Sequence, residues 1–358
     1  MNYLKYLPQI IMRKPVQLTF FITRRCNSVC PYCFYLRSTK DSGEGKEAEL
    51  WEIKKIAEEF KNLVWLAFSG GEIFLRQDIA EITKAFYDSS KPAVILLPTN
   101  GLMPEVIESR VKEILDYCTE SSVVVKLSLD AVGDKHDEIR GVKGNFSSLM
   151  DSYRRLAKLK ETHSNLDIGI NTLYSGLNED YVEEVIEFVK KLDRVSTHTL
   201  SLIRGELVRE DIKQVDYNRF KILSEKLEKE RKNVYSFRGA KLKTAQDIIQ
   251  KRLIYRTIQE ERRVISCYAG RLNLVITENL DVYPCEILNK KMGNLRENGY
   301  SIQRVLSTRQ AEKTLKYILK GECYCTHECY FITNILFNPK LYPSLAKEYL
   351  RLLGITGF

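Results

Sequence analysis

Three cysteines, Cys26, Cys30 and Cys33, lie within eight residues near the start of the chain, a spacing typical of metal ligands. They follow an apolar run at 16–22, whose length and aromatic and β-branched content predict a buried strand. The cysteines are therefore expected on the loop at the carboxyl end of that strand, where α/β barrels collect catalytic groups. Three thiolates can hold three irons of a [4Fe–4S] cluster and leave the fourth iron open to a ligand. A structural zinc site or a ferredoxin-like cluster is the alternative.

A second motif that could bind a ligand follows the next apolar run, 63–68, and consists of Ser69, Gly70, Gly71 and Glu72. Two glycines let the backbone approach a ligand closely and expose its N–H groups. A carboxylate beside them can accept hydrogen bonds from an ammonium group. Most such sequences are only turns, but this one lies one strand–helix unit after the cysteine loop, which favours a binding site.

Further polar residues end later predicted strands and would face the same mouth of a barrel. They are Asn100, Ser128, Asp130, Asn171 and Arg204. Such groups suit ribose hydroxyls or a carboxylate-bearing ligand. The alternative is that they cap helices or fix turns. In the segment 128–141, the imidazole of His136 is expected to fix the loop rather than to catalyse.

These motifs together resemble the radical S-adenosylmethionine (SAM) enzymes with a SPASM or twitch extension. The resemblance rests on CxxxCxxC with an aromatic at Tyr32, on Gly-Gly-Glu, and on a segment similar to SxDG…HDxxRG at 128–141, where Ala131 replaces a glycine. It implies that the open iron chelates the methionine moiety of SAM, and that one electron splits SAM into methionine and a 5′-deoxyadenosyl radical. It also implies that Gly-Gly-Glu holds the amino group of SAM. Ser128 and Arg140 would approach SAM, Arg140 by pairing with its carboxylate.

A second group of cysteines lies near the end of the chain, around a predicted hairpin at 272–277 and 280–283. The group consists of Cys267, Cys285, Cys323, Cys325 and Cys329. With Gly-Asn-Leu at 293–295 it resembles a twitch or SPASM domain and implies one auxiliary [4Fe–4S] cluster with a ligand to spare. Cys267, Cys285 and Cys329 are the expected ligands, and Cys323 and Cys325 compete for the fourth place. Zinc is the alternative, because His327 lies among the cysteines.

The alternation of apolar runs with helical periodicity predicts an α/β fold, a partial (β/α)6 TIM-type barrel with a C-terminal auxiliary Fe–S domain. A doubly wound Rossmann-type sheet is the alternative, but no Gly-x-Gly-x-x-Gly follows the first strand. The expected divisions are an N-terminal extension (1–14), the barrel (15–205), a helical connector (206–263), a twitch/SPASM-like domain (264–335) and a helical tail (336–358). The helix expected at 240–258 could wall the barrel.

The composition, 44% apolar over 358 residues, is that of an ordinary soluble protein, and no apolar run is long enough to span a membrane. No signal peptide is evident, so a cytoplasmic location is expected. The net charge of +9 is spread along the chain, which suits an anionic substrate or acidic redox partner and argues against sequence-specific nucleic-acid binding. Nine cysteines without a secretion signal favour metal ligation over disulfides, and Cys118 is expected to be an inert thiol.

We therefore expect a radical SAM enzyme, of the oxidoreductase or transferase type, that abstracts a hydrogen atom from a small-molecule or peptide substrate with help from an auxiliary Fe–S cluster. A flavodoxin- or ferredoxin-type electron donor is implied by the resemblance. About 16 residues precede the first strand, too few for a separate peptide-recognition domain. The alternatives are a non-enzymatic Fe–S electron carrier, a zinc-dependent binding module or, within the family, a ribosomal-peptide or protein side-chain maturase.

Overall fold

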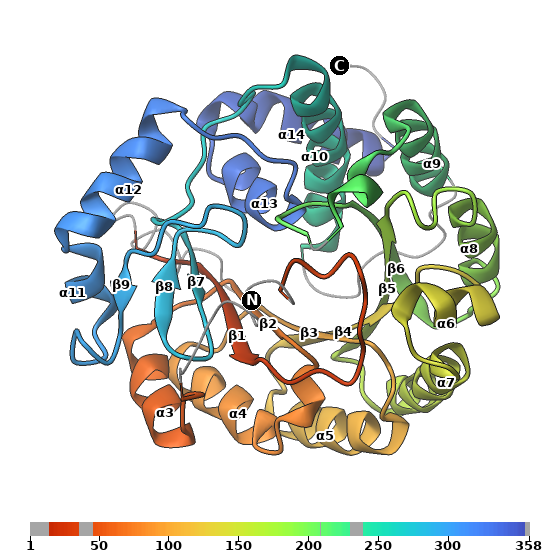
Figure 1. Ribbon diagram of the computed structural model, residues 1–358, viewed down its shortest axis with the longest axis horizontal. Coiled ribbons are helices and arrows are strands. Elements are labelled where there is room, and N and C mark those ends of the chain that lie inside the picture. The colour runs from red at the N-terminus through yellow and green to blue at the C-terminus, as the bar shows by residue number, and fades with distance from the viewer. Residues whose placement is uncertain (1–13, 36–45, 208, 230–238, 355–358) are drawn as a thin grey trace.

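The computed structural model describes residues 14–35, 46–207, 209–229 and 239–354 (Figure 1). Its centre is a curved parallel sheet whose strands alternate with helices along the chain. The six strands of this part are β1 (Gln17–Thr23), β2 (Trp65–Gly70), β3 (Val94–Thr99), β4 (Ser122–Ser128), β5 (Leu166–Tyr174) and β6 (Val195–Leu202).

Consecutive strands lie side by side in the order β6-β5-β4-β3-β2-β1, and all of these pairs are parallel. A doubly wound sheet would reverse its strand order at a switch point. No reversal occurs between β1 and β6, so the Rossmann-type alternative is wrong and the predicted partial barrel is confirmed.

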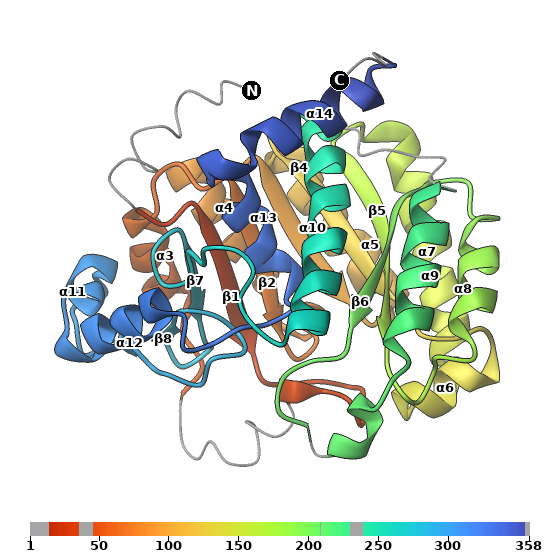
Figure 2. The same cartoon turned by 90° about the horizontal axis from the view of Figure 1, so that it is seen from above.

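One layer of helices covers the outer face of the barrel (Figures 1 and 2). These helices are α3 (Leu50–Glu59), α4 (Ile79–Ser90), α5 (Pro104–Tyr117), α6 (Asp134–Arg140), α7 (Asn145–Thr162) and α8 (Val182–Val189). Their apolar residues recur at helical spacing, as with Ile53, Ile56 and Ala57 of α3, and pack on alternate residues of the strands. Because the other residues of each strand then point inward, the inner face of the sheet is free to carry polar chemistry.

Three local features set the ends of these helices. The N-cap of α7 is Gly144 in the left-handed region, and the Asn145 amide donates to the carbonyl oxygen of Asn100. A 3-10 turn (Ile73–Leu75) precedes α4, which begins at Ile79. Helix α6 lies inside the segment 128–141.

The C-terminal part brings three more strands into the same sheet, β7 (Asn273–Ile276), β8 (Asp281–Tyr283) and β9 (Gly293–Asn294). Strand β7 pairs with β1 in parallel, from Gln17 with Asn273 to Phe20 with Ile276, and β8 and β9 follow as antiparallel neighbours. The predicted hairpin is thus present, and it continues the barrel sheet beyond β1.

The remaining helices lie around the C-terminal hairpin and across the opening between β6 and β7 (Figure 1). They are α9 (Tyr217–Lys229), α10 (Ala240–Glu260), α11 (Ile302–Leu306), α12 (Arg309–Lys320), α13 (Glu328–Leu336) and α14 (Tyr342–Leu352), with 3-10 turns at Glu210–Lys213 and Pro339–Leu341. Helix α10 packs on α13 and α14. Gln17 of β1 donates to the carbonyl oxygen of Cys329 at 3.1 Å, so α13 begins against the inner face of β1.

Among the described residues, no helix combines the length and the apolar character that a membrane crossing requires. The expected N-terminal extension lies outside the described residues, apart from Lys14.

Candidate active site

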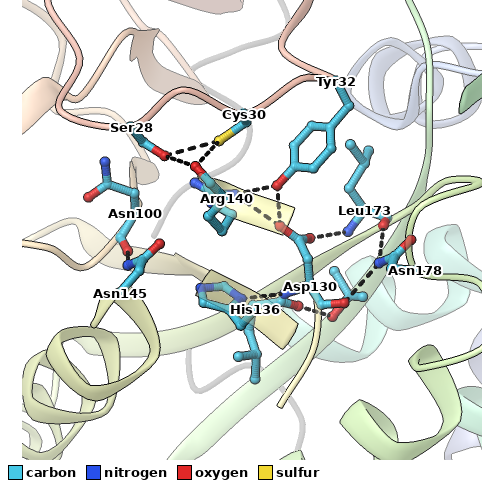
Figure 3. A network of polar contacts seen from close by, with 12 residues as sticks. Ser28, Cys30, Tyr32, Asn100, Asp130, His136, Arg140, Asn145, Leu173 and Asn178 are labelled. Carbon is cyan, nitrogen blue, oxygen red and sulfur yellow. Dashed lines mark hydrogen bonds and ion pairs between the residues drawn. The ribbon is translucent and has the colours of Figure 1, made fainter. Parts of the chain in front are cut away.

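The three cysteines of the N-terminal group lie on the loop that leaves the carboxyl end of β1. Cys26 is exposed, Cys33 is half-buried and Cys30 is buried. A turn in which the Cys33 N–H donates to the Cys30 carbonyl oxygen (3.1 Å) brings the last two together. The hydroxyl of Ser28 lies 3.1 Å from Cys30 Sγ and donates to the carbonyl oxygen of Arg140 (3.0 Å), which fixes the middle of the loop against the end of α6 (Figure 3).

Gly70 and Gly71, expected to meet a ligand, meet the chain itself. A Cβ on Gly70 would lie 2.3 Å from the carbonyl oxygen of Thr23, and one on Gly71 would lie 2.0 Å from that of Arg25. Gly70 also has a φ of +121°, which other residues rarely adopt. The Gly71 N–H donates to the Thr23 carbonyl oxygen at 2.9 Å. The two glycines therefore let β2 hold the start of the cysteine loop.

Glu72 is buried and ties the end of β2 to the end of β3. Its carboxylate accepts hydrogen bonds from the Thr99 hydroxyl (2.9 Å), the Asn100 N–H (2.8 Å) and the Phe74 N–H (3.3 Å). Burial raises the pKa of Glu72 in spite of these donors. Because a carboxylate offers about four lone-pair positions, one remains for a further donor such as an ammonium group.

Tyr32, Asp130 and Arg140 form a buried network at the carboxyl end of β4 (Figure 3). Arg140 Nη1 lies 3.0 Å from both the Tyr32 hydroxyl oxygen and Asp130 Oδ2, and the Tyr32 hydroxyl donates to the same carboxylate. Burial raises the pKa of Tyr32 well above its usual range, so this hydroxyl stays a donor. Arg140 Nε is buried and has no hydrogen-bond partner within the described part of the chain. This guanidinium therefore retains a donor for an additional acceptor.

Two residues behind this network hold Asp130 in place. Nδ1 of the buried His136 accepts the Asp130 N–H at 3.2 Å, and burial lowers the pKa of His136 to about 4. This imidazole is neutral and fixes the loop, as expected. The Asn178 amide donates to the carbonyl oxygens of Asp130 (2.9 Å) and Leu173 (2.7 Å) (Figure 3). The sequence carried no signal for Asn178, which lies in a loop far from every motif.

The other predicted contacts at this mouth fall into two groups. Asn100 lies beside the cysteine loop, since its amide donates to Asn27 Oδ1 at 2.7 Å. Ser128, Asn171 and Ser69 lie on strand positions that face the barrel interior. Ser128 pairs with Asn171 across β4 and β5, and the Ser201 hydroxyl donates to Asn171 Oδ1 at 3.0 Å. Asn100 is therefore placed to shape the cysteine loop, and the other three residues line the space beneath it.

The cysteine loop is also anchored to the C-terminal hairpin. Arg24 and the hydroxyl of Tyr35 both donate to the carboxylate of Glu278, a buried residue between β7 and β8. On the other side of the loop, Glu47 accepts the Thr23 hydroxyl (2.6 Å) and the Arg24 N–H (2.9 Å). Glu47 and Glu278 thus both hold the start of the cysteine loop, and Glu278 also holds its end at Tyr35.

Four of the five C-terminal cysteines, Cys267, Cys285, Cys323 and Cys325, line one cavity of about 90 Å³. Burial raises the pKa of Cys285, Cys323 and Cys325, to about 12 for Cys325, so metal binding would displace their protons. The guanidinium of Arg263 donates to the carbonyl oxygen of Cys323 (2.7 Å) and lies 3.0 Å from its Sγ. Cys323 and Cys325 therefore line the same cavity as Cys267 and Cys285.

Cys329 lies on the barrel side instead, at the start of α13, where it lines a larger cavity. Beside it, His327 Nε2 pairs with Glu286 (2.9 Å) and His327 Nδ1 accepts the Cys329 N–H (3.4 Å). Arg204, expected at the SAM mouth, pairs with Glu328 of α13 at 2.9 Å. Both nitrogens of His327 are therefore occupied by neighbours, which weakens the zinc alternative.

The residues at both cysteine groups fit the expected clusters by donor chemistry. Three thiols share one loop at a strand end, where Cys30 lies near the backbone of Arg140, whose Nε has no partner among the described residues, and four thiols line the second cavity. Within the described part of the chain, no group of three His, Cys, Asp or Glu side chains is arranged to hold a single metal ion. A cubane places four irons and four sulfides between its thiolates, so this finding bears on single-ion sites only.

The sequence matches the model of the radical SAM superfamily over residues 20–189, from β1 to the end of α8. It is 24% identical over 328 residues to the AdoMet-dependent heme synthase of Methanosarcina barkeri, which covers 86% of this chain and 87% of that protein. It is 24% identical over 335 residues to the antilisterial bacteriocin subtilosin biosynthesis protein AlbA of Bacillus subtilis, covering 88% of this chain and 66% of the relative.

Among solved structures, the fold is similar to that of anSMEcpe with bound AdoMet and the Cp18Cys peptide, with a TM-score of 0.57, 18% identity, and coverage of 95% of this chain and 98% of that one. It is also similar to Streptococcus suis SuiB bound to the precursor peptide SuiA, with a TM-score of 0.56, 15% identity, and coverage of 86% and 69%. The superfamily binds a [4Fe–4S] cluster and SAM, and its SPASM-type members carry auxiliary clusters. The matched segment holds the cysteine loop and the strand ends described above, and this chain belongs to the radical SAM superfamily of enzymes.

Proposed function

We propose that this protein binds SAM at a [4Fe–4S] cluster held by Cys26, Cys30 and Cys33 and abstracts a hydrogen atom from a substrate inside the barrel. When bound, the cluster supplies the electron that splits SAM, and the adenosyl fragment supplies the hydrogen-abstracting radical. The observation that carries this proposal is the guanidinium of Arg140, buried behind the cysteine loop with its Nε unpartnered among the described residues. A SAM carboxylate would supply the missing acceptor.

The protein's own residues would then orient SAM. Arg140 takes its carboxylate while Asp130 and Tyr32 hold the guanidinium, and Glu72 offers its remaining lone pair to the amino group. Ser69, Ser128 and Asn171 lie below this group on the inner face of the sheet. Helix α13 covers the inner side of β1, which favours exclusion of water from the radical step.

We propose one auxiliary [4Fe–4S] cluster, held by Cys267, Cys285, Cys323 and Cys325. This differs from the expectation that Cys329 would be a ligand. The shared cavity of the four thiols supports the new assignment, and Cys329 is then the spare cysteine. The non-enzymatic electron-carrier alternative is not favoured, because the relatives are named as synthases and cyclases.

Substrate, electron donor and location belong to the same proposal. Relatives are named for making heme or a bacteriocin, and two similar structures hold peptides, so both a small molecule and a peptide remain candidate substrates. A flavodoxin- or ferredoxin-type donor suits the basic surface implied by a net charge of +9. On the basis of the sequence we also propose a cytoplasmic location. The chain would consist of a barrel (15–205), a connector (206–263) and a twitch/SPASM-like part (264–335).

Anaerobic reconstitution with iron and sulfide, followed by dithionite and SAM, tests the proposal. The wild-type protein should release 5′-deoxyadenosine, and the Cys26→Ala, Cys30→Ala and Cys33→Ala variants should not. The matched control is Cys118→Ala, at a buried thiol that ends α5 and belongs to neither cysteine group, which should release it normally. Continued release from a variant lacking all three loop cysteines would falsify the assignment.

A further inference from the structure

The inner face of β4, β5 and β6 carries two successive rows of residues below the carboxyl ends of the strands, where we place SAM. Lys126, Gly169 and Thr197 pair with one another across the three strands and form the lower row. Ser128, Asn171 and Thr199 form the next row toward the mouth. Because alternate residues of a strand share a face, both rows point into the barrel, about 7 Å apart.

Lys126 is the only Lys or Arg in strands β1 to β6. Its ammonium group donates to the Thr199 hydroxyl at 2.9 Å. Within the described part of the chain, no carboxylate lies within ion-pair distance of this ammonium group, and burial lowers its pKa. Asp247 and Glu328 attract this group only from beyond ion-pair distance, so a cation at this place in the barrel is costly to keep and calls for an anion that is bound rather than built in.

Thr197 gives a second, independent sign of a ligand. It is only 4% exposed, and its hydroxyl has no hydrogen-bond partner among the described residues. Gly169 lies between the two side chains: a Cβ there would be 3.0 Å from Thr197 Oγ1 and 3.1 Å from Lys126 Cγ. The missing side chain at Gly169 therefore leaves the aliphatic stem of Lys126 and the hydroxyl of Thr197 together above bare backbone.

These groups line a cavity of about 1050 Å³ between the inner face of the sheet and helices α9, α10 and α13. Basic residues outnumber acidic ones along its wall, nine to five. The cavity runs from Lys126 to exposed residues of α9 such as Lys221 and Glu225, so a ligand has a route in. Its lining extends from the amino ends of the strands, at Trp65 and Val195, to their middle at Lys126, which separates it from the SAM network at their carboxyl ends.

We propose that this cavity anchors the substrate through a carboxylate group that pairs with Lys126 and accepts a hydrogen bond from Thr197. The inference rests on the proposed function and names its substrate class: an organic acid or peptide with a carboxylate about 7–13 Å, two to four residues of strand, from the carbon presented to SAM. On the inner face of the described strands, Lys126 is the one cation that meets the hydroxyl of Thr197, and its single charge matches that of a carboxylate better than the charge of nearly two on a phosphate.

Protection of Lys126 from acetylation tests the anchor. The reconstituted holoprotein is pulsed with acetic anhydride under anaerobic conditions, and labelling of each lysine is measured by peptide mass spectrometry. The probes are hexanoate against hexanamide, and acetyl-triglycine against its C-terminal amide. Because a bound carboxylate covers the ammonium group, acid at about ten times its dissociation constant leaves about a tenth of the sites free and should slow Lys126 labelling about tenfold, and neither amide should do so.

Lys316 of α12, exposed and outside the cavity, is the internal control, and its labelling should not change. Thr197→Val keeps Lys126 as the reporter and should raise the apparent dissociation constant of the acid about tenfold. Its control is Thr314→Val, at a buried threonine of α12 outside the cavity, which should leave that constant unchanged.

Protection by both acids supports a carboxylate anchor open to peptides, and protection by hexanoate alone supports a small organic acid. Equal protection by acid and amide, or none by either acid, overturns the proposal. Release of 5′-deoxyadenosine is measured on the same preparation. If 5′-deoxyadenosine is released but Lys126 is not protected, the anchor is wrong and the proposed function stands. If Lys126 is protected but no 5′-deoxyadenosine is released, the anchor stands and the proposed function is wrong.

Discussion

Arg24, two residues before Cys26, forms an ion pair with Glu278, 254 residues later in the chain. The Glu278 side chain is completely buried, and that of Arg24 is 21% exposed. Glu278 also accepts the hydroxyl of Tyr35, at the other end of the cysteine loop. One carboxylate from the C-terminal hairpin therefore joins both ends of the loop that would hold the SAM cluster.

Replacing Glu278 with Gln should weaken this loop. The variant leaves Arg24 facing a neutral amide, so we expect a loss of about 1.5–3 kcal/mol in the free energy of unfolding. Urea unfolding followed by circular dichroism under anaerobic conditions measures it. Glu58→Gln, at an exposed acid of α3, is the control and should have no measurable effect. If Glu278→Gln and Arg24→Met lower stability additively in the double variant, the two residues are not coupled and the anchor is wrong.

SAM affinity should depend on Arg140 and Glu72. Arg140→Ala and Glu72→Gln each remove a charge-assisted hydrogen bond, so we expect SAM binding to weaken roughly ten- to hundredfold while cluster absorbance persists. Equilibrium dialysis with labelled SAM measures the affinity. Tyr32→Phe keeps the charge of Arg140 and should weaken binding less than Arg140→Ala does. Unchanged affinity in both charge variants would show that SAM lies elsewhere.

Iron content should separate the C-terminal cysteines. A Cys26/Cys30/Cys33 triple-Ala variant should retain about four irons, all in the auxiliary site. In that background, Cys325→Ala should make the cluster labile, whereas Cys329→Ala should keep the iron. Metal analysis after gel filtration checks both. The opposite result would show that Cys329 is a ligand and Cys325 the spare cysteine. Stoichiometric zinc in the triple variant would show that the C-terminal cysteines bind zinc rather than an Fe–S cluster.

His136 predicts a defined pH dependence of stability. Burial lowers its pKa to about 4, below the unfolded value of about 6.5, so the unfolded chain binds the proton more readily. Stability contributed by the neutral imidazole is complete above about pH 6.5 and falls as the pH drops toward 4. Between pH 7 and 5 the loss should be about 2 kcal/mol.

His136→Asn can still accept the Asp130 N–H but cannot take up a proton in this range. Its urea unfolding free energy should therefore fall less between pH 7 and 5 than that of the wild type, by about the same 2 kcal/mol. Parallel pH dependences for the two proteins would mean that the pKa of His136 is the same in the folded and unfolded states, so that the imidazole is not held neutral by the fold.

The sequence was most informative where local chemistry decides the structure. All residues of β1 are buried because helices cover one side of the strand and the C-terminal part covers the other, and the mostly apolar run at 16–22 predicted the strand to within one residue. The spacing of Cys26, Cys30 and Cys33 likewise predicted their common loop, since three residues in one short segment cannot lie far apart.

What the sequence could not supply are relationships between distant segments. The pairing of Gln17 with Asn273 depends on where the chain returns after the barrel, which no local pattern records. Gly70 and Gly71 were correctly singled out, but the backbone that they approach belongs to residues 23–25 rather than to a ligand. The place of Cys329, on the barrel side of α13, follows from packing and not from cysteine spacing.

The pairing of β7 with β1 makes the two halves of this protein inseparable during folding. A fragment that ended at the last barrel strand would leave the edge of β1 open, with seven consecutive residues, Gln-Leu-Thr-Phe-Phe-Ile-Thr, that are all buried in the full chain. An uncharged strand of this composition with an unpaired edge is a template for association between chains. During synthesis the first strand must therefore wait for more than two hundred residues before its neighbour emerges, and this interval is when a chaperone or early cluster insertion would matter most.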